Sequence, residues 1–397
     1  MKINVYPISS SLHDKTNLDL QSKTLLDELS HLGVTTNIVD DIDKLYTNCD
    51  LSFIFVLSGG SENTFKALLP KLKEPYYLLS YVSNNSLAAS LEILSYLKNQ
   101  NLKGEILHGD TSYIAQRIKQ LNNLKDEEKN EATLGLFGEP SDWLISSDVD
   151  ENVLYNKLHI KIKHIPLKEL IETYHTVKVE KSIEPFKKAK DEIEGTKAYK
   201  LYLALDQLVN KYHLQGFSIR CFDLLSELNT TACLALSKFN DRGIIATCEG
   251  DVPSLIAMYI ASKLNLGPSF QANPSKLDVL DNKILLAHCT IPLRLCSSYL
   301  LDTHFESNIG LAIHGEVKEG KATMFRLDSK LERCFISEGK IIANQYEKNL
   351  CRTQIICEFE HLDKLLKEPL GNHEIIVLGH HKQKLLQYLN SVGIKEI

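Results

Sequence analysis

Apolar residues in the first part of the chain form short runs that alternate with stretches of helical periodicity. Residues 51–57 (LSFIFVL) are such a run, of the kind found in parallel strands that are covered on both faces. The pattern predicts strands at 2–8, 51–57, 76–81, 104–108 and 132–138, and helices at 16–32, 62–72, 86–100 and 111–123. Strands and helices that alternate through short connections indicate an α/β fold with a doubly wound, Rossmann-like parallel sheet.

The second part of the chain is richer in strands. We expect buried strands at 216–221, 243–248, 283–288 and 374–378, helices at 222–239, 252–264 and 382–392, and mostly short strands over 309–358. This pattern predicts an α+β domain with a mixed sheet. The stretch 176–200 is dense in lysine and glutamate and is expected to mark the boundary. The domains are therefore predicted as 1–175 and 176–397.

Composition narrows the class of protein. A chain of 397 residues with 43% apolar residues can bury two cores. The net charge of −6, without a stripe of lysine and arginine, argues against a nucleic-acid partner. The start of the chain is expected to be a strand instead of a signal peptide, and the apolar runs are too short to span a membrane. Nine scattered cysteines without a CxxC pair fit reduced thiols, so we expect a cytoplasmic protein.

Candidate carboxylates lie between an expected strand and an expected helix, in the segment 248–253 (CEGDVP). Glu249 adjoins an apolar run and needs a partner if it is buried, which makes a metal ligand or a proton carrier as reasonable as a structural role. Asp251 has the position of a helix N-cap, with Pro253 in the first turn.

Two histidines stand at the ends of expected strands. His288 ends the run 283–288, where a satisfied core histidine is the ordinary interpretation. His373 directly precedes the strand 374–378, where a metal ligand or a general acid could stand.

Several polar side chains are candidates for substrate contact. Arg352 and Gln354 share a face by alternation and suit hydroxyls or an anion, although an ordinary surface ion pair is an alternative, as it is for Arg220 and Arg326. Ligands of doubly wound sheets bind at the carboxyl ends of the strands. The remaining candidates are the residues after strand 51–57 and the single tryptophan: Ser58, Gly59, Gly60, Glu62 and Trp143.

The motifs of other enzyme classes are missing from the sequence. It contains no GxxxxGK[ST] phosphate loop, no GxGxxG, no GxSxG nucleophile elbow and no HExxH zinc motif.

The segments CEGDVPSLIAM, GPSFQANPSKLD, NKILLAHCTIP and GNHEIIVLG, in that order, resemble the C-terminal domain of the L-fucose isomerase family and its shorter relatives. L-arabinose isomerase shares the arrangement more distantly, and GEPSDWLISS is similar to a signature of the short relatives. The resemblance implies an aldose–ketose isomerase that uses Mn²⁺ or Mg²⁺ and a cis-enediol. It also implies a monosaccharide or derivatised monosaccharide as substrate and a homo-oligomer, trimeric or hexameric.

The resemblance also implies roles for individual residues. Glu249 matches the first carboxylate ligand and acid/base, and His373 matches the C-terminal histidine ligand. His288 falls where the arabinose enzymes place another histidine ligand. Asn273 falls where a second acidic ligand belongs, but its amide adds no negative charge and cannot take up a proton. Either Glu249 serves alone, or Asp251 or Asp278 substitutes, or the metal is lost.

Two alternatives remain open at this point. One is a hydrolase or lyase that uses Glu249 with Asp251 or Asp278. The other is a non-catalytic sugar-binding protein that kept the pocket. Unpaired arginines would favour an anionic substrate, such as a sugar acid or a phosphorylated or sulfonated sugar.

Overall fold

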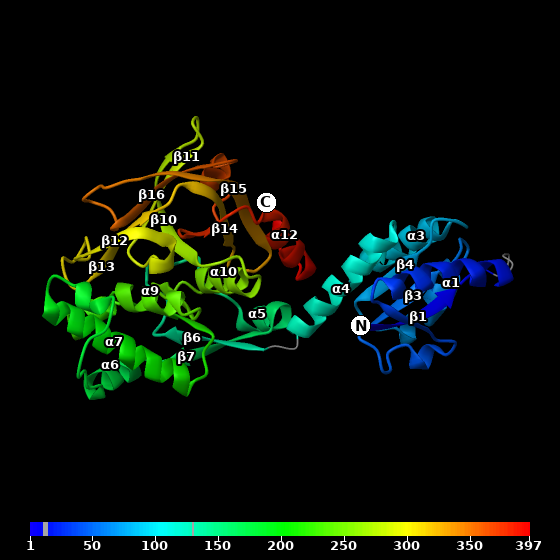
Figure 1. Cartoon of the computed structure of the whole chain (residues 1–397), viewed down its shortest axis with the longest axis horizontal. Helices are drawn as coiled ribbons and strands as arrows, with labels where there is room; N and C mark the ends of the chain where they lie inside the picture. Colours follow the sequence, from blue (N-terminus) through cyan, green and yellow to red (C-terminus); the bar gives the residue numbers. More distant parts are fainter. Residues whose placement is uncertain (11–14, 129–130) are drawn as a thin grey trace. The chain divides into compact units, whose positions relative to one another are not determined.

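The computed structural model describes residues 1–10, 15–128 and 131–397. The chain divides into two compact units, residues 1–130 and 131–397 (Figure 1). Both units contain a parallel sheet with helices, and the second also contains a large antiparallel sheet. This architecture confirms the predicted α/β fold class.

The first unit is a five-stranded parallel sheet in the order β2-β1-β3-β4-β5. This is a doubly wound order. The strands are β1 (Lys2–Ile8), β2 (Thr35–Ile38), β3 (Leu51–Val56), β4 (Tyr76–Ser80) and β5 (Gly104–Leu107); the helices are α1 (Lys15–His31), α2 (Glu62–Leu68), α3 (Ser86–Asn99) and α4 (Thr111–Glu128), with short 3₁₀ helices at Ile42–Lys44 and Leu69–Lys71.

Alternation along the strands explains the two layers of helices. Phe53 and Phe55 of β3 pack with α1 and α4, whereas Ile54 and Val56 pack with α2 and α3. A strand buried on both faces must be apolar at every position, which is the pattern that predicted it. All strands and helices predicted for residues 2–123 are present, and β2 is the strand that was missed.

The second unit begins with a four-stranded parallel sheet in the order β7-β6-β8-β9. Its elements are β6 (Ala132–Phe137), α5 (Glu151–Leu158), β7 (Ile160–Ile165), α6 (Leu167–Thr176), α7 (Glu192–Lys211), β8 (Gly216–Ile219), α8 (Asp223–Leu228), α9 (Cys233–Asp241) and β9 (Ile245–Cys248). The predicted boundary at residue 175 falls inside this unit, because β6 and β7 join a sheet with β8 and not with the strands of the first unit.

A seven-stranded sheet follows, in the order β14-β17-β10-β11-β16-β15-β18. Because β14 also pairs with β15, six antiparallel strands close into a ring, and β18 joins β15 in parallel outside it. The strands are β10 (Ser269–Asp278), β11 (Lys283–His288), β14 (Gly320–Leu327), β15 (Arg333–Asn344), β16 (Thr353–Phe359), β17 (Glu374–Leu378) and β18 (Lys395–Glu396); β12 (Cys296–Asp302) and β13 (Ala312–Val317) form a separate hairpin. Helices α11 (Asp363–Lys367) and α12 (Lys382–Ser391) and 3₁₀ turns at Phe186–Lys188 and Leu293–Leu295 complete the unit.

Helix α10 (Val252–Lys263) joins the two sheets of the second unit. It contacts β8 and β9 on one side and β10, β14 and β17 on the other, and nearly all its residues are buried. A helix that is apolar all round suits this central position. The helix predicted for 222–239 is wrong as a single element: Asn229 adopts a left-handed conformation with φ of 49° and separates α8 from α9.

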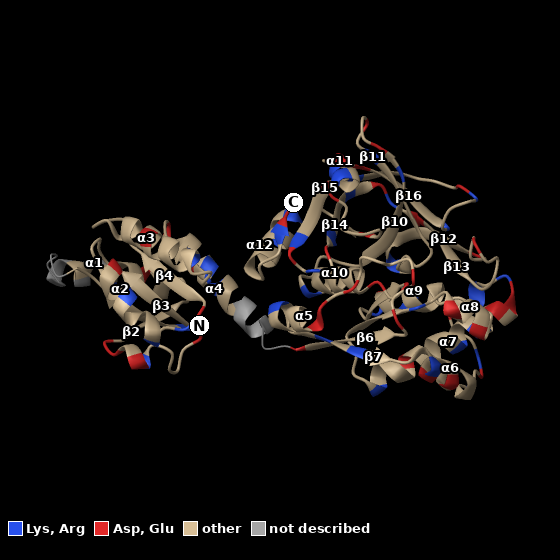
Figure 2. Ribbon diagram, turned by 180° about the vertical axis from the view of Figure 1, so that it is seen from behind, with Lys and Arg blue, Asp and Glu red and all other residues tan. Residues whose placement is uncertain are grey.

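Charged residues are spread over both units. Figure 2 shows lysine and arginine on many elements, interspersed with aspartate and glutamate on α6 and α7. Within the described ranges, no helix combines the length and apolar character needed to cross a bilayer. The expectation that the chain binds no nucleic acid stays a prediction.

Candidate metal centre

Glu249 directly follows β9 in an unusual backbone conformation. Its φ is 68°, a value that is uncommon for residues other than glycine, and Gly250 follows with φ of 69°. A Cβ on Gly250 would lie 2.7 Å from Pro140 Cα, so glycine is required for the close approach of this loop. The backbone N–H of Ser141 donates to the Glu249 carbonyl over 2.8 Å. Such local strain is concentrated at functional sites, where the surrounding structure maintains it.

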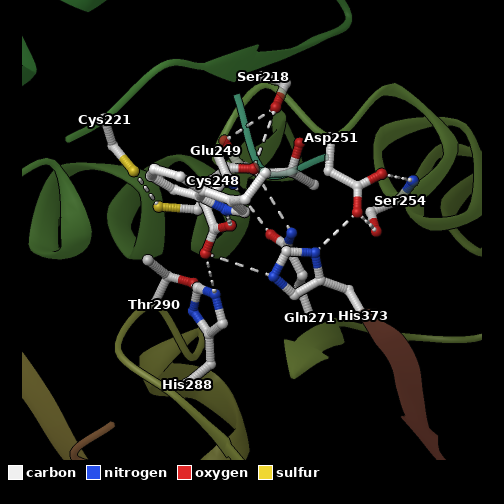
Figure 3. A network of polar contacts seen from close by, with 12 residues as sticks. Ser218, Cys221, Cys248, Glu249, Asp251, Ser254, Gln271, His288, Thr290 and His373 are labelled. Carbon is white, nitrogen blue, oxygen red and sulfur yellow. Dashed lines mark hydrogen bonds and ion pairs between the residues drawn. The ribbon is translucent and has the colours of Figure 1, made fainter. Parts of the chain in front are cut away.

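Three side chains converge at this point (Figure 3). Glu249, His288 at the end of β11 and His373 immediately before β17 offer ligand atoms that all lie within 4.8 Å of one another. Oε1 of Glu249 is 3.4 Å from Nε2 of His373 and 3.8 Å from Nε2 of His288. All three residues are buried. The structure therefore brings together three of the four ligands that the resemblance implied.

Each imidazole is oriented through its other nitrogen. Nδ1 of His373 is 2.7 Å from Oδ2 of Asp251, and Nδ1 of His288 is 2.9 Å from the Thr290 hydroxyl. Both Nε2 atoms therefore point toward Glu249 (Figure 3). Outer partners of this kind fix the ring orientation of metal-binding histidines.

Asp251 is both the N-cap of α10 and the partner of His373. Its Oδ1 accepts from the backbone N–H of Ser254 over 2.9 Å and its Oδ2 from the Ser254 hydroxyl over 2.8 Å. Nη1 of the buried Arg326 lies 3.4 Å from Oδ2 of Asp251 and donates to the carbonyl of His373. The N-cap predicted from the sequence is confirmed, and a link to His373 is added to it.

The electrostatic environment keeps the two carboxylates ionised. Burial raises the pKa of Glu249, but the neighbouring imidazoles of His288 and His373 outweigh burial and hold the pKa well below its usual range. Burial also raises the pKa of Asp251, and the charges of Arg326 and His373 reverse that effect. Burial lowers the pKa of His373, whereas Asp251 and Glu249 raise it to about 9. The site thus attracts positive charge strongly.

The donor set fits a metal ion. Among the described side chains, Nε2 of His373 is a buried nitrogen without a hydrogen-bond partner, and coordination would satisfy it. One carboxylate and two imidazoles, of which Glu249 and His288 line a cavity, form a donor set typical of catalytic metal sites, which keep a position open for substrate or water. The cluster could therefore bind a metal ion.

A cavity of about 200 Å³ adjoins the cluster and is lined by Glu249, His288 and Asn273. Its other walls are rich in thiols and apolar groups: Cys221, Cys233, Cys248, Cys289, Cys351, Phe222, Leu225, Phe305 and Leu350. One water molecule occupies about 30 Å³ in the liquid, so the cavity can hold a small organic molecule. Asn273 faces the same space as two of the proposed ligands.

The other predicted residues of the second unit have structural partners. Asp278 is exposed and accepts from the backbone of Leu280 and Asp281 in the turn after β10. Gln354 bonds to the backbone of Glu347 and Cys351, and Arg352 donates to the carbonyl of Thr303 over 2.8 Å. Arg352 and Gln354 are not part of the cavity lining, and the substrate contacts predicted for them stay predictions.

The predicted residues of the first unit are Ser58, Gly59, Gly60 and Glu62, which follow β3 and begin α2. Their position at the carboxyl end of a parallel strand is as expected. Their contact with a substrate stays a prediction. Trp143, in the second unit, donates its indole N–H to Oε2 of Glu249 over 2.6 Å.

Sequence reasoning named Asp251 and Trp143 but did not find the other residues around the cluster. Thr290 and the thiol wall lacked any recognisable signal. Arg326 could have been recognised from the sequence, because an arginine in an apolar strand needs a buried counter-charge. Arg220, with the same signal, pairs with Asp142 and Asp223, each at 3.0 Å.

No family model matches the chain. The chain is 28% identical over 203 residues to the sulfoquinovose isomerase of Clostridium sp. (strain MSTE9), covering 47% of this chain and 44% of that protein. It is 22% identical over 266 residues to the sulfoquinovose isomerases of Priestia aryabhattai and Priestia megaterium, covering 61% of this chain and 58% of theirs. The chain thus spans about half the length of the curated relatives that it matches. These similarities support a relationship to sugar isomerases, in agreement with the resemblance at that level.

Proposed function

We propose that this chain is an aldose–ketose isomerase that acts on a monosaccharide. The observation that carries the proposal is the buried carboxylate of Glu249, which faces two imidazoles and lines a cavity. The names of the three relatives support the same reaction class.

Isomerisation needs a base that takes a proton from the carbon next to a carbonyl and returns it to the neighbouring carbon. Glu249 is the buried carboxylate of the cavity lining, whereas Glu306, which also lines it, is exposed. We assign the proton transfer to Oε1 of Glu249. The apolar and thiol walls exclude water while the proton is held there.

We propose that Glu249, His288 and His373 hold a divalent ion, with the amide oxygen of Asn273 as a further ligand. Two imidazoles fit Mn²⁺ better than Mg²⁺, which prefers oxygen ligands. When bound, the ion supplies positive charge that stabilises the negative charge developing on the substrate oxygens. The proposal also keeps the homo-oligomer that the resemblance implied and the cytoplasmic location expected from the cysteine pattern.

The hydrolase alternative requires a second carboxylate in the cavity, and neither of the two predicted aspartates lines it. It required Asp251 or Asp278 beside the substrate, but Asp251 is fully buried behind His373 and Asp278 lies in an exposed turn. A pair of carboxylates flanking a glycosidic bond is therefore not formed by these residues.

The cavity lining favours an uncharged sugar. Its basic side chains are His288 and His304, and none of the residues described around it is lysine or arginine. Arginine and lysine are the usual partners of a sulfonate or phosphate group. We therefore propose a neutral aldose as the preferred substrate, with sulfoquinovose as the competing candidate.

The test is whether the protein catalyses exchange of the sugar C2 hydrogen with solvent only when a metal ion is bound. The purified protein is stripped of metal, loaded with Mn²⁺ or left bare, and incubated in D₂O with neutral aldoses and with sulfoquinovose. NMR then follows deuterium at C2 and the appearance of a ketose. Exchange only in the loaded sample supports the proposal. Saturable sugar binding without exchange on any sugar would instead favour a binding protein.

Asn273→Asp is expected to bind Mn²⁺ about tenfold more tightly than the wild type, equivalent to about 1.4 kcal/mol. A charged oxygen ligand is favoured by a hard divalent ion over a neutral amide. Isothermal titration calorimetry measures the change. Ser275→Asp is the matched control, because Ser275 lines the same cavity from the same strand. Equal affinities of the two variants would mean that Asn273 is not a ligand.

A further inference from the structure

The two oxygens of Glu249 have different partners. Oε1 faces Nε2 of His288 and His373, whereas Oε2 accepts the indole N–H of Trp143 over 2.6 Å. A hydrogen bond to a carboxylate is charge-assisted and shorter than one between neutral groups. The indole has no other polar atom, so this contact uses its full hydrogen-bonding capacity.

The indole itself is held in place from two sides. Its ring packs edge-to-face on Phe222, with ring centroids 4.9 Å apart and an interplanar angle of 85°. The preceding residues are tied to Arg220, which donates to the Pro140 carbonyl over 2.7 Å and pairs with Asp142 over 3.0 Å. A side chain on a fixed loop can hold a carboxylate in one orientation.

Trp143 lies beside the cavity and not in its lining, and 51% of its surface is exposed. Phe222, on which the indole packs, is part of the lining. This position fits a residue that acts through Glu249. The substrate contact predicted for Trp143 from the sequence stays a prediction.

We infer that Trp143 is a positioning residue that holds Oε2 of Glu249 and so presents Oε1 alone to the metal ion and to the substrate proton. The inference rests on the proposed function. Removing an outer partner of a metal ligand typically lowers metal affinity or activity by about 10–100-fold. Glu249 without the indole N–H is free to rotate, and its two oxygens become equivalent.

Trp143→Phe tests the inference because it retains an aromatic ring for Phe222 and lacks the N–H. We expect Mn²⁺ affinity, measured by isothermal titration calorimetry, to fall about tenfold or more. At saturating Mn²⁺, kcat is expected to fall while KM changes less than about twofold, because the indole does not line the cavity. Ile145→Ala is the control on the same loop, since Ile145 is 92% exposed. Wild-type affinity and kcat in Trp143→Phe would overturn the inference.

A second readout does not depend on metal or turnover. Trp143 is the only tryptophan, so selectively excited fluorescence reports on this indole alone. Glu249→Gln replaces the charged acceptor with a neutral one and is expected to shift the emission, whereas Ile145→Ala is not. Identical emission of wild type and Glu249→Gln would show that the contact is absent and would refute the inference. A wild type that binds no divalent ion and isomerises no sugar, but shows the shift, would refute the proposed function alone.

Discussion

Glu249→Gln is expected to lower kcat by about 10³-fold or more while the protein remains folded. Glutamine has nearly the same shape and can still accept the indole N–H of Trp143 through its amide oxygen. It cannot take up a proton, and it removes the only negative charge of the metal cluster. Both proposed roles of Glu249 are therefore lost together.

The measurement is steady-state isomerisation at saturating Mn²⁺, with circular dichroism and thermal unfolding as controls for the fold. Glu306→Gln is the matched control, because Glu306 lines the same cavity but is exposed. A Glu249→Gln enzyme that keeps a tenth or more of the wild-type kcat would remove Glu249 from the reaction.

Arg326→Leu is expected to reduce the free energy of unfolding by about 3–5 kcal/mol, the usual cost of breaking a buried ion pair by removing one partner. Arg326 is 2% exposed and lies 3.4 Å from Asp251. Burial raises the pKa of the nearby Glu374 to about 7 even though the charge of Arg326 acts to lower it. The variant leaves the buried Asp251 without this counter-charge and the carbonyl of His373 without its donor.

Chemical denaturation measures the loss. The fluorescence of Trp143 follows the second unit selectively, since the chain has no other tryptophan. Arg333→Leu is the matched control: the Arg333 side chain is 51% exposed and its pair with Asp328 is expected to contribute at most about 1 kcal/mol. If both variants lose the same free energy of unfolding, the buried ion pair of Arg326 contributes no more to stability than the exposed pair of Arg333.

Much of the first unit could be predicted because its signals are local. Strands such as β3 are apolar at nearly every position, and a parallel sheet between two helical layers favours that pattern. The metal cluster was predicted from a different kind of information. Glu249, His288 and His373 are far apart in sequence, and only the resemblance to a known family put them into one site.

The second unit was harder to predict because its strands depend on distant pairing. Strand β10 contains Pro274 and a register shift between Pro274 and Lys276, so its pattern is interrupted. The boundary at 175 was placed on composition, whereas pairing of β6 with β8 places the segment from 131 onward in the second unit. The partners of Arg326 come from two distant segments, the start of α10 and the residue before β17, and sequence spacing carries no information about them.

Glu249 follows a strand of the parallel sheet, whereas His288 ends β11 and His373 immediately precedes β17, two strands of the closed antiparallel ring. An ion held by all three would bridge the two sheets near the N-terminus of α10, where Asp251 caps the helix and contacts His373. Such an ion binds the native state and not the unfolded chain, so its binding free energy adds to the free energy of folding. At a free concentration one hundred times its Kd the gain is about 2.7 kcal/mol. A chelator is therefore expected to lower the thermal unfolding midpoint of the second unit, and Mn²⁺ in excess to restore it. In this protein the cofactor of the reaction would also be a cross-link of the fold.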